Sequence, residues 1–139
     1  MTADSLDAYL EAWPADQAGL KKALVELRQA ALALAKASEA FIARPGVSHS
    51  LRYDLAPRPA GRARQVFFLV DVVEDAGVRF LSVCFYEDEV DDPEELGNAI
   101  PQGLFAETGY CFDVDGYDPE QMAYLLARLK VAHRSASAA

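Results

Sequence analysis

The sequence predicts an α+β fold, a two-layer sandwich in which helices cover one face of an antiparallel sheet. Two apolar segments, residues 65–73 and 78–86, are rich in Val and Phe and have the composition of central strands. Four residues, Glu74 to Gly77, separate them, and the sequence Asp75-Ala76-Gly77 fits a short hairpin loop and therefore antiparallel pairing. Patterns with helical spacing precede and follow the strands, so the helices are expected on one face of the sheet.

The first 43 residues have helical patterns. Apolar residues spaced by three and four predict a short helix over residues 5–13, which Pro14 ends. A long helix is expected from there to about Ala43. Its apolar and small residues form a heptad seam: Leu20, Leu24, Leu27, Ala31, Leu34, Ser38 and Phe41. The seam fits either a face packed on the sheet or a dimer interface between helices. The packed face is favoured, because Ala31 and Ser38 are poor coiled-coil contacts.

About four strands are expected, at residues 48–55, 65–73, 78–86 and 110–114. With the hairpin loop at residues 75–77, Val73 is expected near Arg79 and Leu69 near Val83.

Two Asp-Pro pairs have the composition of helix starts, with Asp at the N-cap and Pro at the first helical position. Asp92–Pro93 predicts a short helix inserted in the sheet region, which Gly97 and Pro101 interrupt. Asp118–Pro119 predicts a C-terminal helix that ends at about His133.

A length of 139 residues predicts a single domain over 1–139. Its expected parts are a helical region (1–43), the sheet with the inserted helix (48–114), the C-terminal helix (118–133) and a disordered tail (134–139).

The net charge is −9, from 13 basic and 22 acidic residues. This balance argues against general nucleic-acid binding and against binding to anionic membranes, since both require a basic surface. The charge is unevenly distributed. Residues 44–64 contain five arginines and one acid, whereas residues 71–95 contain ten acids and one arginine.

The first residues have neither the basic nor the apolar segment of a secretory signal, and the apolar runs are too short to span a bilayer. A cytoplasmic protein is therefore expected, with Cys84 and Cys111 as buried free thiols in preference to one disulfide. Frequent alanine, with nine arginines against four lysines, suggests a bacterial chain.

The candidate ligand-binding residues are Arg44, His49, Arg52 and Asp71. Guanidinium groups suit carboxylates and phosphates, so Arg44, His49 and Arg52 predict an anion site in the basic segment. The alternative is that these arginines are solvated or pair with the chain's own acids, and Arg58, Arg62 and Arg64 are expected in a mobile loop.

Asp71 interrupts an apolar strand. If helices cover its face of the sheet, the carboxylate is desolvated and indicates a functional site. The alternative is that the opposite face forms the core, which leaves Asp71 solvated or paired with an arginine.

No catalytic motif is present, and no cofactor is predicted. No metal site is predicted either, because the acidic runs lack the spacing of a calcium loop. The sequence favours a non-enzymatic binding or protein-interaction module that forms a homodimer. One alternative is a protein that binds a small anion or a nucleotide through an arginine-rich site, with or without catalysis. A lower-ranked alternative is an acidic mimic of nucleic acid that binds a basic protein.

Overall fold

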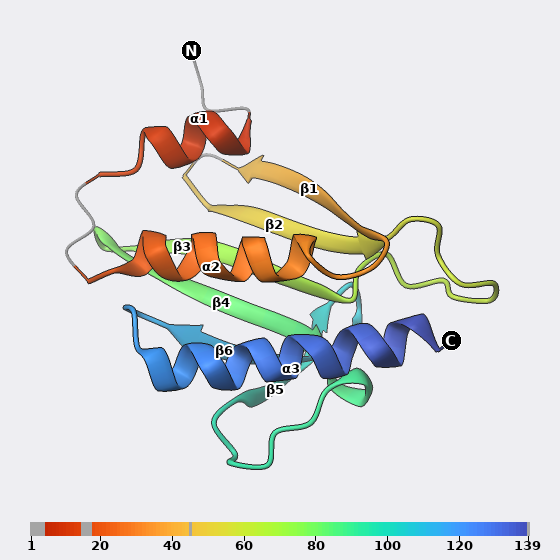
Figure 1. The fold of residues 1–139 in the computed structure, drawn as a ribbon. Helices are drawn as coiled ribbons and strands as arrows, with labels where there is room; N and C mark the ends of the chain where they lie inside the picture. The colour runs from red at the N-terminus through yellow and green to blue at the C-terminus, as the bar shows by residue number, and fades with distance from the viewer. Residues whose placement is uncertain (1–4, 15–17, 45, 139) are drawn as a thin grey trace.

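The computed structural model describes residues 5–14, 18–44 and 46–138, and it has the α+β architecture that the sequence predicts (Figure 1). The elements in chain order are α1 (Leu6–Glu11), α2 (Leu20–Leu32), β1 (Ala37–Arg44), β2 (Ser48–Leu55), β3 (Phe68–Asp75), β4 (Val78–Tyr86), the 3-10 helix η1 (Glu87–Glu89), β5 (Asn98–Leu104), β6 (Glu107–Val114) and α3 (Pro119–Ser137).

The sheet has six strands in the order β1-β2-β3-β4-β6-β5, and the prediction of about four strands was therefore wrong. Every pair of neighbouring strands is antiparallel, as the short hairpin loop indicated. The two strands absent from the prediction, β1 and β5, are the two edges of the sheet.

The predicted long helix to Ala43 is also wrong. Helix α2 ends at Leu32, and the chain then reverses through Lys36, whose φ of 63° lies in the left-handed region. Residues 37–44 form β1, which pairs with β2 at all eight positions from Ala37↔Leu55 to Arg44↔Ser48. Pairing with a strand that follows in the chain overrides the local helical pattern of this alanine-rich segment.

The β3–β4 hairpin has a shorter loop than expected. Asp75 pairs with Val78, so the loop contains only Ala76 and Gly77, both with positive φ (52° and 81°). The register is therefore shifted by one residue from the predicted one, and Val73 lies opposite Phe80. Because of this shift, Asp71 lies opposite Ser82, where the predicted register would place it opposite Leu81.

Helices α2 and α3 lie on one face of the sheet (Figure 1). The heptad seam, as far as Ala31, is part of this core: Leu20, Leu24, Leu27 and Ala31 are all buried. They pack in the main cluster with inward residues of the strands, which are Leu51, Tyr53, Leu55, Phe68, Val70, Val72, Leu81, Val83, Phe85, Phe112 and Val114. The seam is therefore a core face, and this part of it is not available as a dimer interface.

The opposite side of the sheet is called the helix-free face here. It is defined by the side chains that alternate with the core, among them Arg52, Asp71, Ser82 and Cys84. A second, smaller apolar cluster lies on it: Val66, Leu69, Cys84, Tyr86 and Leu104, with Cys111 packed against them.

Cys84 and Cys111 form a disulfide, so the expectation of free thiols was wrong. The two residues lie directly opposite each other on β4 and β6, with Cα atoms 4.2 Å apart. The sequence contains no local motif for this bond. The bond depends on the register between β4 and β6, which pair in the sheet although β5 lies between them in the chain.

The inserted helix expected after Asp92 does not form. Instead, η1 ends β4 and a turn leads into β5, with the Asp92 carboxylate accepting hydrogen bonds from the amides of Leu96 (3.0 Å) and Gly97 (2.9 Å). The hydroxyls of Tyr110 and Tyr124 also donate to this carboxylate. Asp92 thus satisfies amide groups, as a capping residue would, but in a turn.

The second Asp-Pro pair does begin a helix. The Asp118 side chain accepts from the amides of Glu120 and Gln121, and Pro119 is the first residue of α3. The helix continues past the predicted end at His133 to Ser137, with Ala136 buried, so a tail beginning at 134 was wrong for these residues. Within the described part of the chain, no helix is both long and apolar enough to cross a membrane.

Candidate functional site

The structure separates the four predicted ligand-binding residues between the two faces of the sheet. Arg44, Arg52 and Asp71 lie on the helix-free face, whereas His49 lies on the core side. The His49 ring stacks on Tyr9 of α1, with centroids 4.2 Å apart, and on Phe41 at 5.9 Å. Burial, together with the nearby positive charge of Arg79, lowers the pKa of His49. His49 therefore belongs to the aromatic packing beneath α1.

Arg44 and Arg52 differ from most other arginines of the chain. Arg44 donates to the Ser48 hydroxyl (2.9 Å), and Arg52 donates to the Ser50 hydroxyl (3.2 Å) and lies 5.3 Å from the centre of the Phe105 ring. Within the described residues, neither forms an ion pair with a carboxylate. Six arginines do form such pairs: Arg28, Arg58, Arg62, Arg64, Arg79 and Arg128.

Asp71 is half-buried on the helix-free face, between Ser50 of β2 and Ser82 of β4. Its Oδ1 atom is buried and has no hydrogen-bond partner in the part of the chain that the structure describes. The face that carries Asp71 is thus the one without helices. The alternative in which the opposite face forms the core is therefore confirmed, and Asp71 is partly solvated, with no arginine partner among the described residues.

Residues of the basic segment (44–64) and of the acidic segment (71–95) contact each other. The Arg62 side chain is 3% exposed and forms a bidentate pair with Glu89, which is 8% exposed, with contacts of 2.6 and 3.0 Å. Arg64 contacts Asp88, Glu89 and Glu107 and stacks 4.2 Å from the centre of the Tyr86 ring. Two arginines of the basic segment thus pair with two acids of the acidic segment, and the loop that was expected to be mobile is held at these two arginines.

The charged groups near β1 are satisfied within the chain. Arg28 of α2 donates to both oxygens of Glu39 (2.9 and 3.1 Å), and the Tyr53 hydroxyl donates to the same carboxylate (2.9 Å). Burial raises the pKa of Tyr53, and the charge of Glu39 adds to the effect. The helix side of β1 is thus anchored to α2 and β2.

Among the described residues, β1 has no strand paired on its outer side, and α1 packs against it through the ring of Tyr9, 5.5 Å from that of Phe41. Beyond the ladder to β2, the described residues give β1 only two backbone hydrogen bonds, one at each end: Ala37 donates to Leu34, and Arg44 accepts from Val47. Ala40, Ile42 and Arg44 alternate as exposed side chains, and Ile42 is 37% exposed. The strand contains no proline and no register shift. Unpaired backbone groups of this kind form a template for another strand, and we call residues 37–44 the β1 edge.

The other edge strand is interrupted. β5 pairs with β6 at Asn98, Ala99 and Ile100, and again only at Leu104, with a register shift between. Pro101 lies within this gap and has no amide to donate, and Gln102 has a φ of 58°. Proline, bulges and irregular backbone are the features with which proteins prevent pairing at a sheet edge.

Sequence reasoning did not find the β1 edge, because residues 37–44 continue the helical seam. The signal that was available is the pair Phe41–Ile42 just before a proline and a glycine, which is also typical of a strand that enters a hairpin. Within the described residues, no group of acidic, histidine or cysteine side chains is arranged to hold a metal ion. No family model, curated protein or solved structure matches the chain.

Proposed function

We propose that this protein is a non-enzymatic protein-interaction module that works as a homodimer, in which the β1 edges of two copies pair into one continuous sheet. The observation that supports this most directly is the open, regular β1 edge, in contrast to the interrupted β5 edge. An unprotected edge of eight residues that is not used would be a liability for aggregation.

A second copy of the chain is a suitable partner for this edge. Between residues 37 and 44 the charges of Glu39 and Arg44 cancel, so the β1 edge is neutral although each chain carries a charge of −9. Two copies can therefore approach at this edge with less repulsion than elsewhere on an acidic surface. Salt at physiological concentration screens the remaining repulsion beyond about 8 Å.

The alternation of the strand restricts the register of the pair. Residues directly opposite each other in an antiparallel ladder share a face of the sheet. A register centred on Phe41 meets this condition, because it places Ile42 opposite Ala40 of the second copy, and Arg44 opposite Ser38. Glu39 then lies opposite Ala43, so no like charges oppose each other. The exposed apolar surface of Ile42 is covered in this arrangement.

The molar mass of the protein in solution, measured by light scattering during size-exclusion chromatography, tests the proposal. We expect about 30 kDa for the native protein, twice the chain mass of 15.2 kDa. Ile42→Lys places a charge on the β1 edge and is expected to give a folded monomer. Ile100→Lys is the matched control, since Ile100 lies on the β5 edge with a similar exposure (41% against 37%), and should remain a dimer.

Two results would overturn the proposal. One is a native protein of about 15 kDa at the highest concentration tested, including the case in which it binds a strand of a different protein. The other is an Ile42→Lys variant that dimerises as tightly as the native chain.

A second candidate function is the binding of a small anion by Arg44 and Arg52, which have no carboxylate partner among the described residues. Such binding predicts a higher melting temperature with phosphate, a nucleotide or a dicarboxylate, because these would bind only the folded state. Arg52→Gln should remove the effect. An unchanged melting temperature with all three would exclude this candidate.

The proposed compartment remains the cytoplasm. The Cys84–Cys111 bond bears on it, because cytoplasmic disulfides in mesophiles are usually transient, catalytic or redox-sensing, whereas structural ones persist in oxidising compartments. Rapid acid quenching of cells followed by alkylation would report the state of the two cysteines, and cell fractionation would report the compartment.

A further inference from the structure

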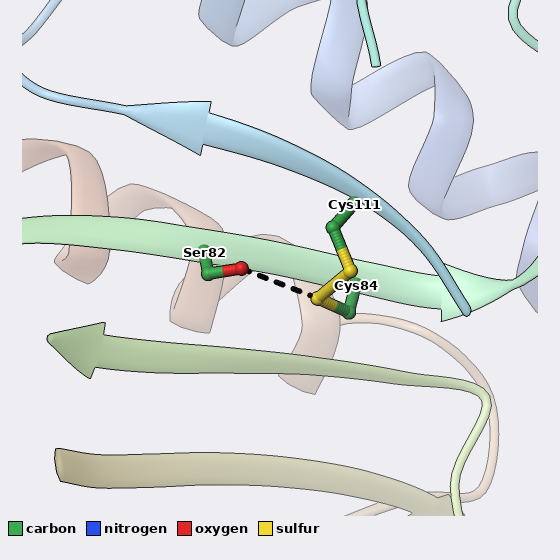
Figure 2. Close-up of a disulfide and its surroundings, with 3 residues drawn as sticks. All are labelled: Ser82, Cys84 and Cys111. Atoms are coloured by element: carbon green, nitrogen blue, oxygen red, sulfur yellow. Dashed lines mark hydrogen bonds between the residues drawn. A yellow bond between two sulfur atoms is a disulfide. The ribbon is translucent and has the colours of Figure 1, made fainter. Parts of the chain in front are cut away.

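The Cys84–Cys111 disulfide lies on the helix-free face, away from the main core. Figure 2 shows the two sulfur atoms and Ser82 on the side of the sheet opposite the helices. The neighbours of Cys84 along β4, Val83 and Phe85, point into the main core instead. The bond is therefore outside the main core and belongs to the small apolar cluster that includes Leu104.

The bond joins two strands that are already paired. β4 and β6 are aligned at six positions, from Leu81↔Val114 to Tyr86↔Gly109, and Phe112 and Val114 of β6 are buried in the main core. Neither the backbone pairing of β4 with β6 nor the main core involves the two sulfur atoms. The fold is thus expected to persist in the reduced protein. A purely structural disulfide, in contrast, is one whose reduction destabilises the fold.

The two cysteine residues differ in exposure. Cys84 is 7% exposed, whereas Cys111 is partly exposed. On its other side, Cys111 pairs with Asn98 of the edge strand β5, and Asn98 is exposed. A thiolate is therefore expected to reach Cys111 more readily than Cys84, and when it attacks the Cys111 sulfur, the sulfur of Cys84 becomes the leaving group.

The leaving sulfur has a hydroxyl beside it. The Ser82 Oγ atom lies 3.3 Å from the Cys84 Sγ atom, and both side chains belong to the same face of β4 (Figure 2). A hydroxyl can donate a hydrogen bond to a thiolate, and hydrogen bonds to charged groups are stronger than those to neutral ones. Stabilising the departing thiolate makes Cys84 the better leaving group.

We infer that this disulfide is a site of reversible thiol–disulfide exchange with an external dithiol. One thiolate of the dithiol attacks the Cys111 sulfur, a mixed disulfide forms, and the Cys84–Cys111 bond breaks to give the Cys84 thiolate, which then takes a proton. The second thiol of the reductant attacks its own sulfur in the mixed disulfide. The reductant leaves as a disulfide, and Cys111 leaves as a thiolate that is also protonated. Two electrons pass from the dithiol to the protein, and the reverse sequence reoxidises it.

Reduction of the native protein by dithiothreitol tests this inference. After alkylation, intact-mass spectrometry should show two modified cysteines without any denaturant, while the near-ultraviolet circular dichroism remains that of the folded protein. With the monothiol 2-mercaptoethanesulfonate, peptide mapping should locate the mixed disulfide at Cys111. Alkylation only in concentrated guanidinium, loss of the folded spectrum on reduction, or a mixed disulfide at Cys84 would overturn the inference.

Variants of Ser82 test the role of the hydroxyl. Ser82→Ala is expected to slow reduction by about threefold to tenfold, because the leaving thiolate loses a hydrogen-bond donor. Ser82→Thr keeps the hydroxyl and should keep most of the rate. Ser38→Ala, on the same face of β1, is the matched control and should not alter it. Equal rates for Ser82→Ala and the native protein would contradict the assignment to Ser82.

Discussion

β1 and β5 are both edge strands, but the backbone of each is held in place differently. β1 runs through eight consecutive pairs with β2, whereas β5 pairs with β6 at three consecutive positions and once more at Leu104. The path before and within β5 depends on side chains: Arg62 pairs with Glu89 of η1, Asp92 holds the preceding turn, and Gly97 lies against aromatic rings.

We therefore expect the two edges to govern different properties: β5 the stability of the fold, and β1 the formation of the homodimer. Changes to the supports of β5 are expected to lower the free energy of unfolding and leave the homodimer intact as long as the chain is folded. Changes to the exposed side chains of the β1 edge are expected to weaken the homodimer and to leave the free energy of unfolding of the monomer nearly unchanged.

Arg62→Ala should lower the free energy of unfolding the most. The substitution leaves Glu89 buried with only its 3.0 Å contact to Arg64, and it removes the donor to the Val66 carbonyl. Breaking a buried ion pair lowers the free energy of unfolding by about 3–5 kcal/mol. We expect a value near the lower end of this range, because Glu89 keeps its contact with Arg64. Urea unfolding measures the change. Arg58→Ala is the control, because Arg58 forms an exposed pair with Asp54 and its loss should have little effect. Similar midpoints for the two variants would contradict the account.

Gly97→Ala should have the second-largest effect on the free energy of unfolding. An added Cβ would lie 2.7 Å from a ring carbon of Tyr110 and 2.8 Å from one of Phe112, which is buried. The rings would have to shift, at a cost of about 1–3 kcal/mol. Thermal or urea unfolding measures this effect, and Ala99→Ser at the exposed neighbouring strand position is the control. A Gly97→Ala variant as stable as the native protein would mean that the turn before β5 adjusts freely.

Asp92→Asn tests the turn through its pH dependence. Burial opposes ionisation, but hydrogen bonds from Tyr110, Tyr124 and the amides of Gly97 and Leu96 lower the pKa of Asp92 from 3.8 to about 2. Because the folded-state pKa is the lower one, the ionised carboxylate stabilises the fold above the unfolded pKa, and this contribution disappears as pH falls through about 2.

At neutral pH, Asp92→Asn should lower the free energy of unfolding by about 1–2 kcal/mol, a range that allows for solvent screening of this accessible group. The difference from the native protein should shrink as the pH is lowered from 3.8 toward 2 in urea titrations. A difference that stays constant over this range would show that the charge of Asp92 does not hold the turn.

Ile42→Lys should have the smallest effect on stability. The side chain is already exposed, so the free energy of unfolding of the monomer should change by no more than about 0.5 kcal/mol. Unfolding of the diluted protein, where the native chain is also monomeric, measures this quantity. A larger loss would mean that Ile42 belongs to the fold, and that a loss of dimer in this variant reflects unfolding.

The sequence predicted the elements with strong local signals. The strands around Phe68–Asp75 and Val78–Tyr86, and the start of α3 at Asp118, follow from composition and capping. β1 was assigned to the helix, because alanine-rich residues in a heptad pattern are compatible with helix and the pairing with β2 is not local. The inserted helix after Asp92 failed for a similar reason: the capping groups are present, but they bind amides of a turn.

The candidate site was only partly predictable. His49 and Arg52 are three residues apart on one strand, so the period of two already places them on opposite faces. Whether Asp71 lies under the helices depended on which face of the sheet they cover, and the alternation within β3 does not determine this. The pairing of Arg62 with Glu89 and of Cys84 with Cys111 joins positions 27 residues apart in each case, and no local pattern indicates such contacts.

Hydrogen exchange of the edge-strand amides, measured at low and at high protein concentration, tests whether the β1 edges of two copies pair. If the β1 edges pair, the outward-facing amides of residues 37–44 gain protection as the concentration rises, while the amides of β5 exchange at an unchanged rate. Amides of β1 that exchange equally fast at both concentrations, or protection that appears in β5 instead, would contradict the account.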